Sequence, residues 1–194
     1  AGCKGRVLLF GVDVDPSTGR KKIALRLKIE SRHIRGPVTA ISSVDGYLLA
    51  TFGTTPSSLR IFYYDATTDG FVARSFVDTP FSAISMKVVK NYILVGDLYK
   101  SVQLLHWHNF KREFRTLAKD PNPVQVYDCD FIQHERTLGM VVTDNDSNLQ
   151  LLHFDSSKNL LINRGDFHLA SSVNELIQLA VAQDKSIALY GTLD

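Results

Sequence analysis

The sequence predicts an all-β protein, a partial β-propeller that spans residues 1–194. Three similar segments carry this prediction, namely Leu59–Asp65, Val102–His108 and Leu149–Asp155, and Val7–Asp13 is a looser copy. In each close copy both faces of the strand are mostly apolar, which predicts a strand buried on both sides between stacked sheets. A strand that returns about every 45 residues is typical of a propeller, where one four-stranded blade has that length.

Composition narrows the class of protein further. The 194 residues are 44% hydrophobic, which is enough for the core of one repetitive domain. The net charge is +2, and neither a signal peptide nor an apolar run near the roughly 18 residues of a membrane helix is present, so we expect a soluble protein without membrane contact. Cys3 and Cys129 lie far apart, which predicts no disulfide framework, no thiolate zinc site and a reducing compartment.

The N-terminal region predicts two strands. Gly5–Val14 is mostly apolar and predicts a buried strand, and an acidic turn at Asp13–Gly19 follows it. Lys22–Glu30 alternates strictly between apolar and polar residues, which predicts an outer strand with one face in water.

Three blades are predicted after this region. Their inner strands begin near Val38, Ala83 and Tyr127, and tight turns such as Asp45-Gly46 and Lys90-Asn91 follow two of them. We expect Trp107 to lie between adjacent blades. The remaining strands are predicted, blade by blade, at Tyr47–Phe52, Leu59–Tyr64 and Phe71–Phe76; at Tyr92–Val95, Val102–Trp107 and Phe114–Ala118; and at Thr137–Val142, Leu149–Phe154 and Leu160–Asn163.

The C-terminal region has two possible interpretations. Ser172–Glu175 matches a helix capping box, and a helical apolar face follows it. The phase of the repeat instead predicts a strand at Val173, and we favour the strand. Ser186–Thr192 then predicts a second strand, so the chain has about four blades' worth of strands with half a blade at each end. Either the two halves pair, or the chain is a piece of a larger propeller.

An acidic segment imitates a calcium-binding loop. Asp144–Asn148 places oxygen-bearing side chains at the first, third and fifth positions of such a loop, and Asp155 falls at the twelfth. The sixth position is Leu149, where the sharp turn of the loop needs glycine, and Leu149 also begins a repeated strand. We therefore predict a polar turn between strands and no metal.

The sequence offers no convincing catalytic or metal-binding group. His106 and His108 lie on one strand face and supply two ligands of a possible metal site, but no third ligand is evident. His106 matches Tyr63 and His153 in the repeat, which favours a structural role for the ring. Motifs for a serine nucleophile, a zinc protease or a phosphate-binding loop are absent. We predict a protein that is not an enzyme and has no cofactor.

Basic residues are concentrated before Gly36, where the sequence has nine lysines and arginines but three acidic residues. This surplus predicts either contact with nucleic-acid phosphates or protection of an outermost strand against edge-to-edge aggregation. We favour edge protection.

Several segments resemble the third propeller of the CPSF A-subunit family. The broadly shared feature is a Gly-Asp-Leu-x-x-Ser turn, which begins here at Gly96. Other segments resemble the polyadenylation-factor branch of the family best, rather than the damaged-DNA-binding or branch-site splicing branches. These segments are Arg35–Ala40, Val126–Phe131, Leu138–Gly139 followed by Val142–Leu149, and Arg164–His168.

The resemblance implies a longer protein with three seven-bladed propellers and a helical tail. It also implies a nuclear scaffold for the WD-repeat and zinc-finger subunits that recognise the AAUAAA signal, with mostly indirect contact to pre-mRNA. Family members hold partner segments in a cleft between the first and third propellers. By propeller connectivity and this resemblance, we expect partner contacts at one rim, from Arg32, Arg35, Asn122, Pro123 and Gln125; the alternative is that these residues only cap the blades.

A second function class remains open. The chain is alternatively a nucleic-acid-binding propeller, through its basic N-terminal region or in the manner of the damaged-DNA relative. An adaptor role in ubiquitin ligation or splicing, as in other branches of the family, belongs to the same alternative.

Overall fold

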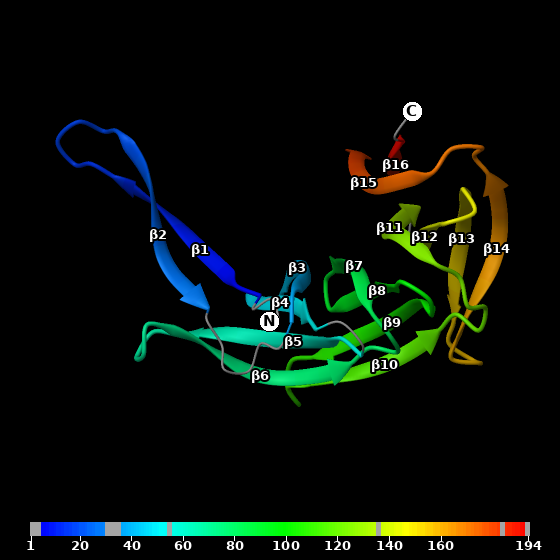
Figure 1. The fold of residues 1–194 in the computed structure, drawn as a ribbon, viewed down its shortest axis with the longest axis horizontal. Helices are drawn as coiled ribbons and strands as arrows, with labels where there is room; N and C mark the ends of the chain where they lie inside the picture. The colour runs from blue at the N-terminus through cyan, green and yellow to red at the C-terminus, as the bar shows by residue number, and fades with distance from the viewer. Residues whose placement is uncertain (1–4, 30–35, 54–55, 135–136, 183–184, 193–194) are drawn as a thin grey trace.

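The computed structural model describes residues 5–29, 36–53, 56–134, 137–182 and 185–192, and only the backbone of 26–29, 134, 180–182, 185, 186 and 188. Throughout these residues the regular structure consists of β-strands (Figure 1). The strands follow one another as antiparallel neighbours, apart from a single parallel pair. The predicted all-β class is therefore confirmed.

Three complete blades follow one another along the chain, and we name them A, B and C. Blade A comprises β3 (Val38–Val44), β4 (Tyr47–Phe52), β5 (Ser58–Asp65) and β6 (Gly70–Asp78). Blade B comprises β7 (Ala83–Val89), β8 (Tyr92–Asp97), β9 (Ser101–His108) and β10 (Glu113–Lys119). Blade C comprises β11 (Val126–His134), β12 (Thr137–Asp144), β13 (Asn148–Asp155) and β14 (Leu160–His168).

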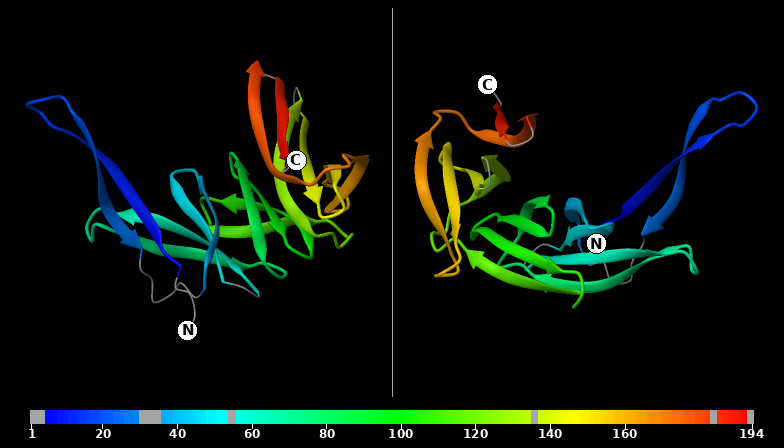
Figure 2. Two further views of the ribbon diagram at one scale, coloured as in Figure 1. Left: turned by 45° about the horizontal axis from the view of Figure 1, so that its top comes forward. Right: turned by 180° about the vertical axis from the view of Figure 1, so that it is seen from behind.

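The blades form an open arc. Strands β3, β7, β11 and β15 (Val173–Ala182) line its concave side, while β6, β10 and β14 lie on its convex side (Figures 1 and 2). Each first strand contacts the first strand of the next blade. Single residue pairs also join neighbouring blades, with Lys119 beside Leu160 and His134 beside Lys185. The arrangement is that of successive propeller blades around a common axis.

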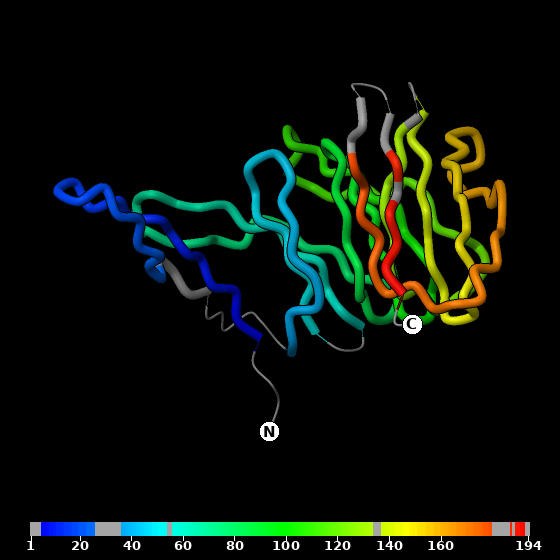
Figure 3. The backbone as a smooth tube through the Cα atoms, turned by 90° about the horizontal axis from the view of Figure 1, so that it is seen from above, coloured from blue at the N-terminus to red at the C-terminus, as the bar shows by residue number. Residues whose placement is uncertain are grey.

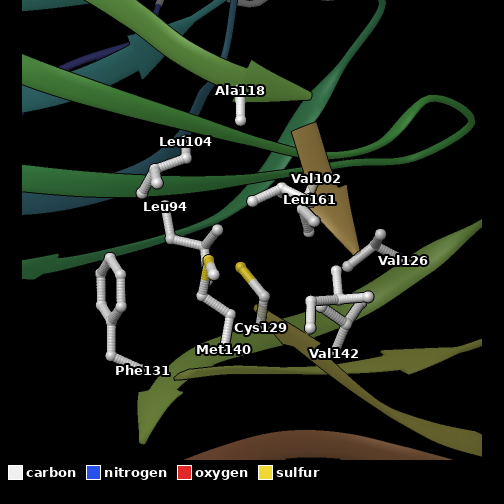
Figure 4. Close-up of a cluster of buried hydrophobic side chains, with 11 residues drawn as sticks. Leu94, Val102, Leu104, Ala118, Val126, Cys129, Phe131, Met140, Val142 and Leu161 are labelled. Carbon is white, nitrogen blue, oxygen red and sulfur yellow. The ribbon is translucent and has the colours of Figure 1, made fainter. Parts of the chain in front are cut away.

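Each junction between blades has its own apolar core. The A/B core joins Leu49, Leu59 and Ile61 of blade A to blade B residues that include Ile93 and Trp107. The B/C core joins blade B residues such as Leu94 and Leu104 to blade C residues such as Cys129, Phe131 and Met140 (Figure 4). Alternate residues of β8 and β9 thus enter opposite cores, which confirms for β9 the prediction that the repeated strand is buried on both faces, while most residues of the copy in β13 are half-buried.

Trp107 lies at the centre of the A/B junction, as predicted. Its side chain is fully buried, with its ring centroid 5.8 Å from that of Tyr47 in blade A and 5.0 Å from that of Phe114 in its own blade. The indole N–H has no hydrogen-bond partner among the described residues. Apolar packing therefore holds this ring in place.

The N-terminal hairpin departs from the prediction of a buried strand and an outer strand with one wet face. β1 (Val7–Val14) and β2 (Lys21–Ile29) do pair, but Phe10 is 56% exposed and Ile23 is 72% exposed. Among the hairpin residues whose side chains the structure describes, only Val7 joins an apolar core, against Phe52 and Phe62 of blade A. A two-stranded ribbon has two faces and no second sheet here to cover them, so its apolar residues stay in water.

The C-terminal segment forms a strand, as the phase of the repeat predicts. β15 pairs antiparallel with β16 (Lys185–Thr192), and Val173 and Leu176 are buried in a core with Val141 of blade C. The two half-blades do not pair: β1 and β2 form a separate sheet at the opposite arm of the arc from β15 and β16 (Figure 1). The described residues contain no helix that is long and apolar enough to cross a bilayer.

The buried position of Trp107 leads to a stability prediction. We expect Trp107→Ala to lower the free energy of unfolding by about 3–5 kcal/mol, because the substitution leaves a cavity in the A/B core. Phe110→Ala is the matched control, since Phe110 is 97% exposed, and we expect it to change stability by less than about 0.5 kcal/mol. Urea unfolding of both variants measures the difference, and equal losses would contradict the assignment.

Candidate functional site

The nominated partner contacts lie in the link between blades B and C. Asn122 and Pro123 are exposed and Gln125 is half-buried, so the structure brings these three residues together in one loop. Arg32 and Arg35 lie outside the described residues. The loop is anchored at both ends, because the Asn122 N–H donates to Asp120 Oδ1 (3.0 Å) and the Gln125 carbonyl accepts from the N–H of Asn145 (3.0 Å).

Backbone hydrogen bonds build the rim that contains this loop. In each blade a backbone hydrogen bond joins the start of the third strand to the link that leads to the next blade. The three bonds run from Ser57 N to Phe81 O (2.9 Å), from Ser101 N to Val124 O (3.1 Å) and from Leu169 N, in the link, back to Ser147 O of blade C (2.9 Å). Because the main chain holds these loops, exposed side chains such as those of Asn122 and Pro123 are not needed to fix them. In Figure 3 this rim is the lower edge of the arc, and the turn between β3 and β4 lies at the upper edge.

The Gly-Asp-Leu-x-x-Ser turn, Gly96–Ser101, belongs to the same rim. Asp97 is buried, and its carboxylate accepts from the N–H groups of Phe81 (2.8 Å) and Tyr99 (3.0 Å). A Cβ atom on Gly96 would lie 3.0 Å from Val126 Cγ1, so a larger residue would require this side chain of blade C to shift by a few tenths of an ångström. The ring of Tyr99 remains 45% exposed beside Phe81, which adds an aromatic contact to the rim.

A cavity of about 350 Å³ opens at the opposite edge of the B/C junction. Its floor is the outer end of the B/C core, where Leu104, Phe131 and Met140 are almost fully buried. Polar and aromatic groups surround the opening. The residues that line the cavity are Val89, Lys90, Tyr92, Leu104, Phe131, Gln133, Thr137, Leu138, Met140, His153 and Phe154.

Sequence reasoning did not identify this cavity, although a signal was present in the repeat. Phe154 occupies the position of Trp107 in the next blade, and Leu161, which pairs with it, occupies the position of Phe114. Two smaller side chains at a position that is filled in the preceding junction leave unfilled volume. An alignment of the repeats by side-chain size thus indicates a hollow at this junction.

A polar cluster joins the first strands of the blades. Lys87 Nζ lies 3.5 Å from Asp130 Oδ2 and 3.9 Å from Asp128 Oδ2, and it donates to the carbonyl of Leu176 (2.8 Å). Asp128 also accepts from the N–H of Leu176 (2.7 Å) and from the hydroxyl of Ser85. Burial raises the pKa of Asp130, and the nearby Lys87 ammonium opposes this shift. The cluster connects β7, β11 and β15, so its role is to hold blades together.

The acidic segment that imitates a calcium loop is a polar turn, as predicted. Asp144 Oδ1 accepts from the N–H groups of Asp146 (3.0 Å) and Asn148 (2.9 Å), and Asp155 accepts separately from Ser157 N–H (2.9 Å). The carboxylates thus serve two different turns. Across the part of the chain that the structure describes, no cluster of three or more His, Cys, Asp or Glu residues has the geometry of a metal site.

The histidines of β9 take part in ring contacts. The centroids of His106 and His108 are 6.3 Å apart, and His106 packs edge-on against Tyr92 at 5.2 Å. Burial lowers the pKa of His106, with smaller contributions from the nearby charges of His108 and Arg115. This arrangement agrees with the predicted structural role of His106.

The architecture and its rim define the class of the chain as an array of β-propeller blades. The family described as "CPSF A subunit region" matches residues 1–194, and the chain belongs to this family. It is 29% identical over 204 residues to "Cleavage and polyadenylation specificity factor subunit 1" of Arabidopsis thaliana and 28% identical over 214 residues to the protein of that name in Drosophila melanogaster. Each match covers 98% of this chain and 14% of the relative.

A fungal relative extends the comparison. "Protein cft1" of Schizosaccharomyces pombe is 29% identical over 196 residues, which cover 97% of this chain and 13% of that protein. The chain therefore spans about one seventh of the length of these relatives. The match supports the resemblance noted from the Gly-Asp-Leu-x-x-Ser turn and the neighbouring segments.

The polar turn at Asp144 leads to a prediction on metal binding. We expect thermal unfolding curves in a chelator and in millimolar calcium to superimpose, because a ligand that binds only the native state must raise its stability. Differential scanning fluorimetry measures the effect, with magnesium at equal ionic strength as the control. A rise of several degrees in calcium alone contradicts the assignment.

The buried thiol of Cys129 leads to a prediction on reactivity. Burial raises the pKa of Cys129 to about 12, and the hydrogen bond with Ser85 opposes the shift. Since the thiolate is the reactive form, the native thiol should resist a disulfide reagent at pH 8 and react fully after unfolding in guanidinium. A Cys3→Ser variant isolates this thiol. Rapid labelling of the native variant at pH 8 is the contrary result.

Proposed function

We propose that this chain is part of a protein-interaction scaffold in the nuclear machinery for pre-mRNA cleavage and polyadenylation. The observation that carries the proposal is the family match over the whole chain, to relatives whose names assign them to the cleavage and polyadenylation specificity factor. Because the chain spans 14% of those relatives, we further propose that it is a partial propeller, residues 1–194, of a larger multi-propeller protein.

The rim supports a role in holding partners. Its loops are fixed by main-chain hydrogen bonds, and it exposes Tyr99, Asn122 and Pro123. A preorganised surface of this kind loses little entropy when a partner binds. We propose that Asn122, Pro123 and Gln125, together with Arg32 and Arg35, contact the WD-repeat and zinc-finger subunits that recognise the AAUAAA signal, so that the scaffold contacts RNA mostly through them.

Co-purification with those subunits tests the proposal. The double variant Asn122→Arg and Gln125→Arg places two cations on the rim, and we expect it to lower the affinity for the partner subunits at least about tenfold, as the loss of central interface contacts does. Ser156→Arg and Lys158→Glu, at exposed positions of the β13–β14 turn, form the control. Unchanged affinity of the double variant, with an unchanged unfolding midpoint, contradicts the proposed contact surface.

A titration with RNA separates the scaffold from a nucleic-acid-binding propeller. We expect an AAUAAA-containing RNA to bind tightly only when the partner subunits are present, because the chain carries a net charge of only +2. The measurement is made at two salt concentrations, with an RNA of scrambled sequence as the control. Tight, sequence-preferring binding by the chain alone supports the alternative function instead.

A further inference from the structure

The B/C cavity lies at the edge opposite the proposed partner rim, so it is a separate surface. Lys90 is in the β7–β8 turn, and Gln133 and Thr137 are near the tips of β11 and β12. The loops of the rim, which include Asn122, connect the other ends of these strands. A ligand in the cavity therefore leaves the rim free.

The equivalent A/B junction shows what closes such a cavity. There Trp107, packed between Tyr47 and Phe114, fills the space, and Asp45 in the β3–β4 turn accepts a hydrogen bond from the side-chain amide of Asn109 in blade B. This bond bridges the junction at its outer end. The A/B junction is thus filled by an aromatic side chain and closed at its outer end by a hydrogen bond.

The B/C junction has a smaller or unmatched residue at each of these positions. Phe154 replaces Trp107 and Leu161 replaces Phe114, while Lys90 replaces Asp45 in the turn. Lys90 makes no hydrogen bond or ion pair with the described residues. Tyr92, the counterpart of Tyr47, is 37% exposed at the opening. The B/C junction therefore lacks both the large side chain and the side-chain hydrogen bond that close the A/B junction.

The chemistry of the opening indicates what enters it. Among the residues that the structure describes, no carboxylate lines the cavity, whereas Lys90 and His153 do. His106 packs on Tyr92 and pairs with Arg115 on the next strand, so a second cation, Arg115, lies beyond Tyr92 and His106. Glu113 is the acidic residue of that strand pair, and its carboxylate lies 4.0 Å from Lys111 Nζ. The site is an apolar hollow with one lysine ammonium, that of Lys90, at its border.

We propose that this cavity is a docking site for a short acidic peptide segment of a partner protein, which inserts one large apolar side chain between blades B and C. The floor of Leu104, Phe131 and Met140 offers no hydrogen-bonding group to the polar edges of a nucleobase, and burial of unpaired polar groups is unfavourable. An aromatic or aliphatic side chain has no such requirement. A volume of about 350 Å³ is at the lower end for ligand pockets, which suits one or two side chains.

Fluorescence polarisation with labelled ten-residue peptides tests the site on this 194-residue chain. The probe peptide is Ser-Gly-Asp-Asp-Glu-Phe-Asp-Glu-Ser-Gly, and its controls carry Ala in place of Phe or Lys in place of every acidic residue. We expect the probe to bind at least tenfold more tightly than either control, with an affinity that falls as salt is added. Equal affinities overturn the proposal.

Two variants locate the binding. Phe154→Trp copies the side chain that fills the A/B junction, and Lys90→Glu reverses the charge at the opening. We expect each to weaken the probe at least tenfold, and Lys100→Glu, at an exposed position on the opposite rim, to leave it unchanged. If Phe154→Trp does not fold, Lys90→Glu still decides. Unchanged binding by Lys90→Glu overturns the proposal.

Other occupants give different results in the same assay. Displacement of the probe by a twelve-residue uridine oligonucleotide at equal concentration indicates a nucleic-acid site and overturns the peptide assignment. Concentration-dependent self-association that Phe154→Trp abolishes indicates a second copy of this chain and also overturns it. A monomer that prefers the probe to the oligonucleotide supports the proposal.

Discussion

Every blade of this protein must bury both of its faces, and the rest of the structure depends on this constraint. A four-stranded antiparallel sheet with apolar residues on both sides is stable only when another sheet covers each side. In β8, Leu94 enters the B/C core while its neighbours Ile93 and Val95 enter the A/B core. Because each blade supplies half of two cores, the stability of one blade depends on the next. This coupling makes a rigid scaffold from short strands that are joined by short links.

The same constraint decides where polar groups are placed. Polar side chains that enter the stacked sheets need complete hydrogen bonding, since an unpaired buried group is costly. Asp97 and Asp144 meet this need by accepting from backbone N–H groups of the loops that they organise. Asp128 meets it by joining strands of three successive blades. The buried carboxylates therefore position loops and blades, and the side chains left exposed on those loops are available to partners.

Much of this architecture is predictable because propeller geometry repeats. The segment around Trp107 recurs in three blades, and its phase alone correctly favoured a strand at Val173 over the helix that the capping box suggests. Two features escaped this reasoning. The burial of β1 depends on whether another sheet covers it, which its apolar residues do not reveal, and Phe10 is exposed. The cavity depends on the size difference between Phe154 and Trp107, which a pattern of apolar and polar residues does not record.

The two edges of the arc are stabilised in different ways, and this difference separates their roles. At the rim of Asn122 the loops are held by main-chain hydrogen bonds and by buried carboxylates such as Asp97, so the exposed side chains can change there without loss of the fold. At the opposite edge the junctions are closed by side chains, as Asp45 and Trp107 close the A/B junction. A substitution at such a position opens the junction, and the adjacent packed junctions keep the blades in place. Phe154 stands at the position of Trp107, and Lys90 stands at the position of Asp45. The B/C junction can therefore expose its apolar core for recognition while the neighbouring junctions stay packed.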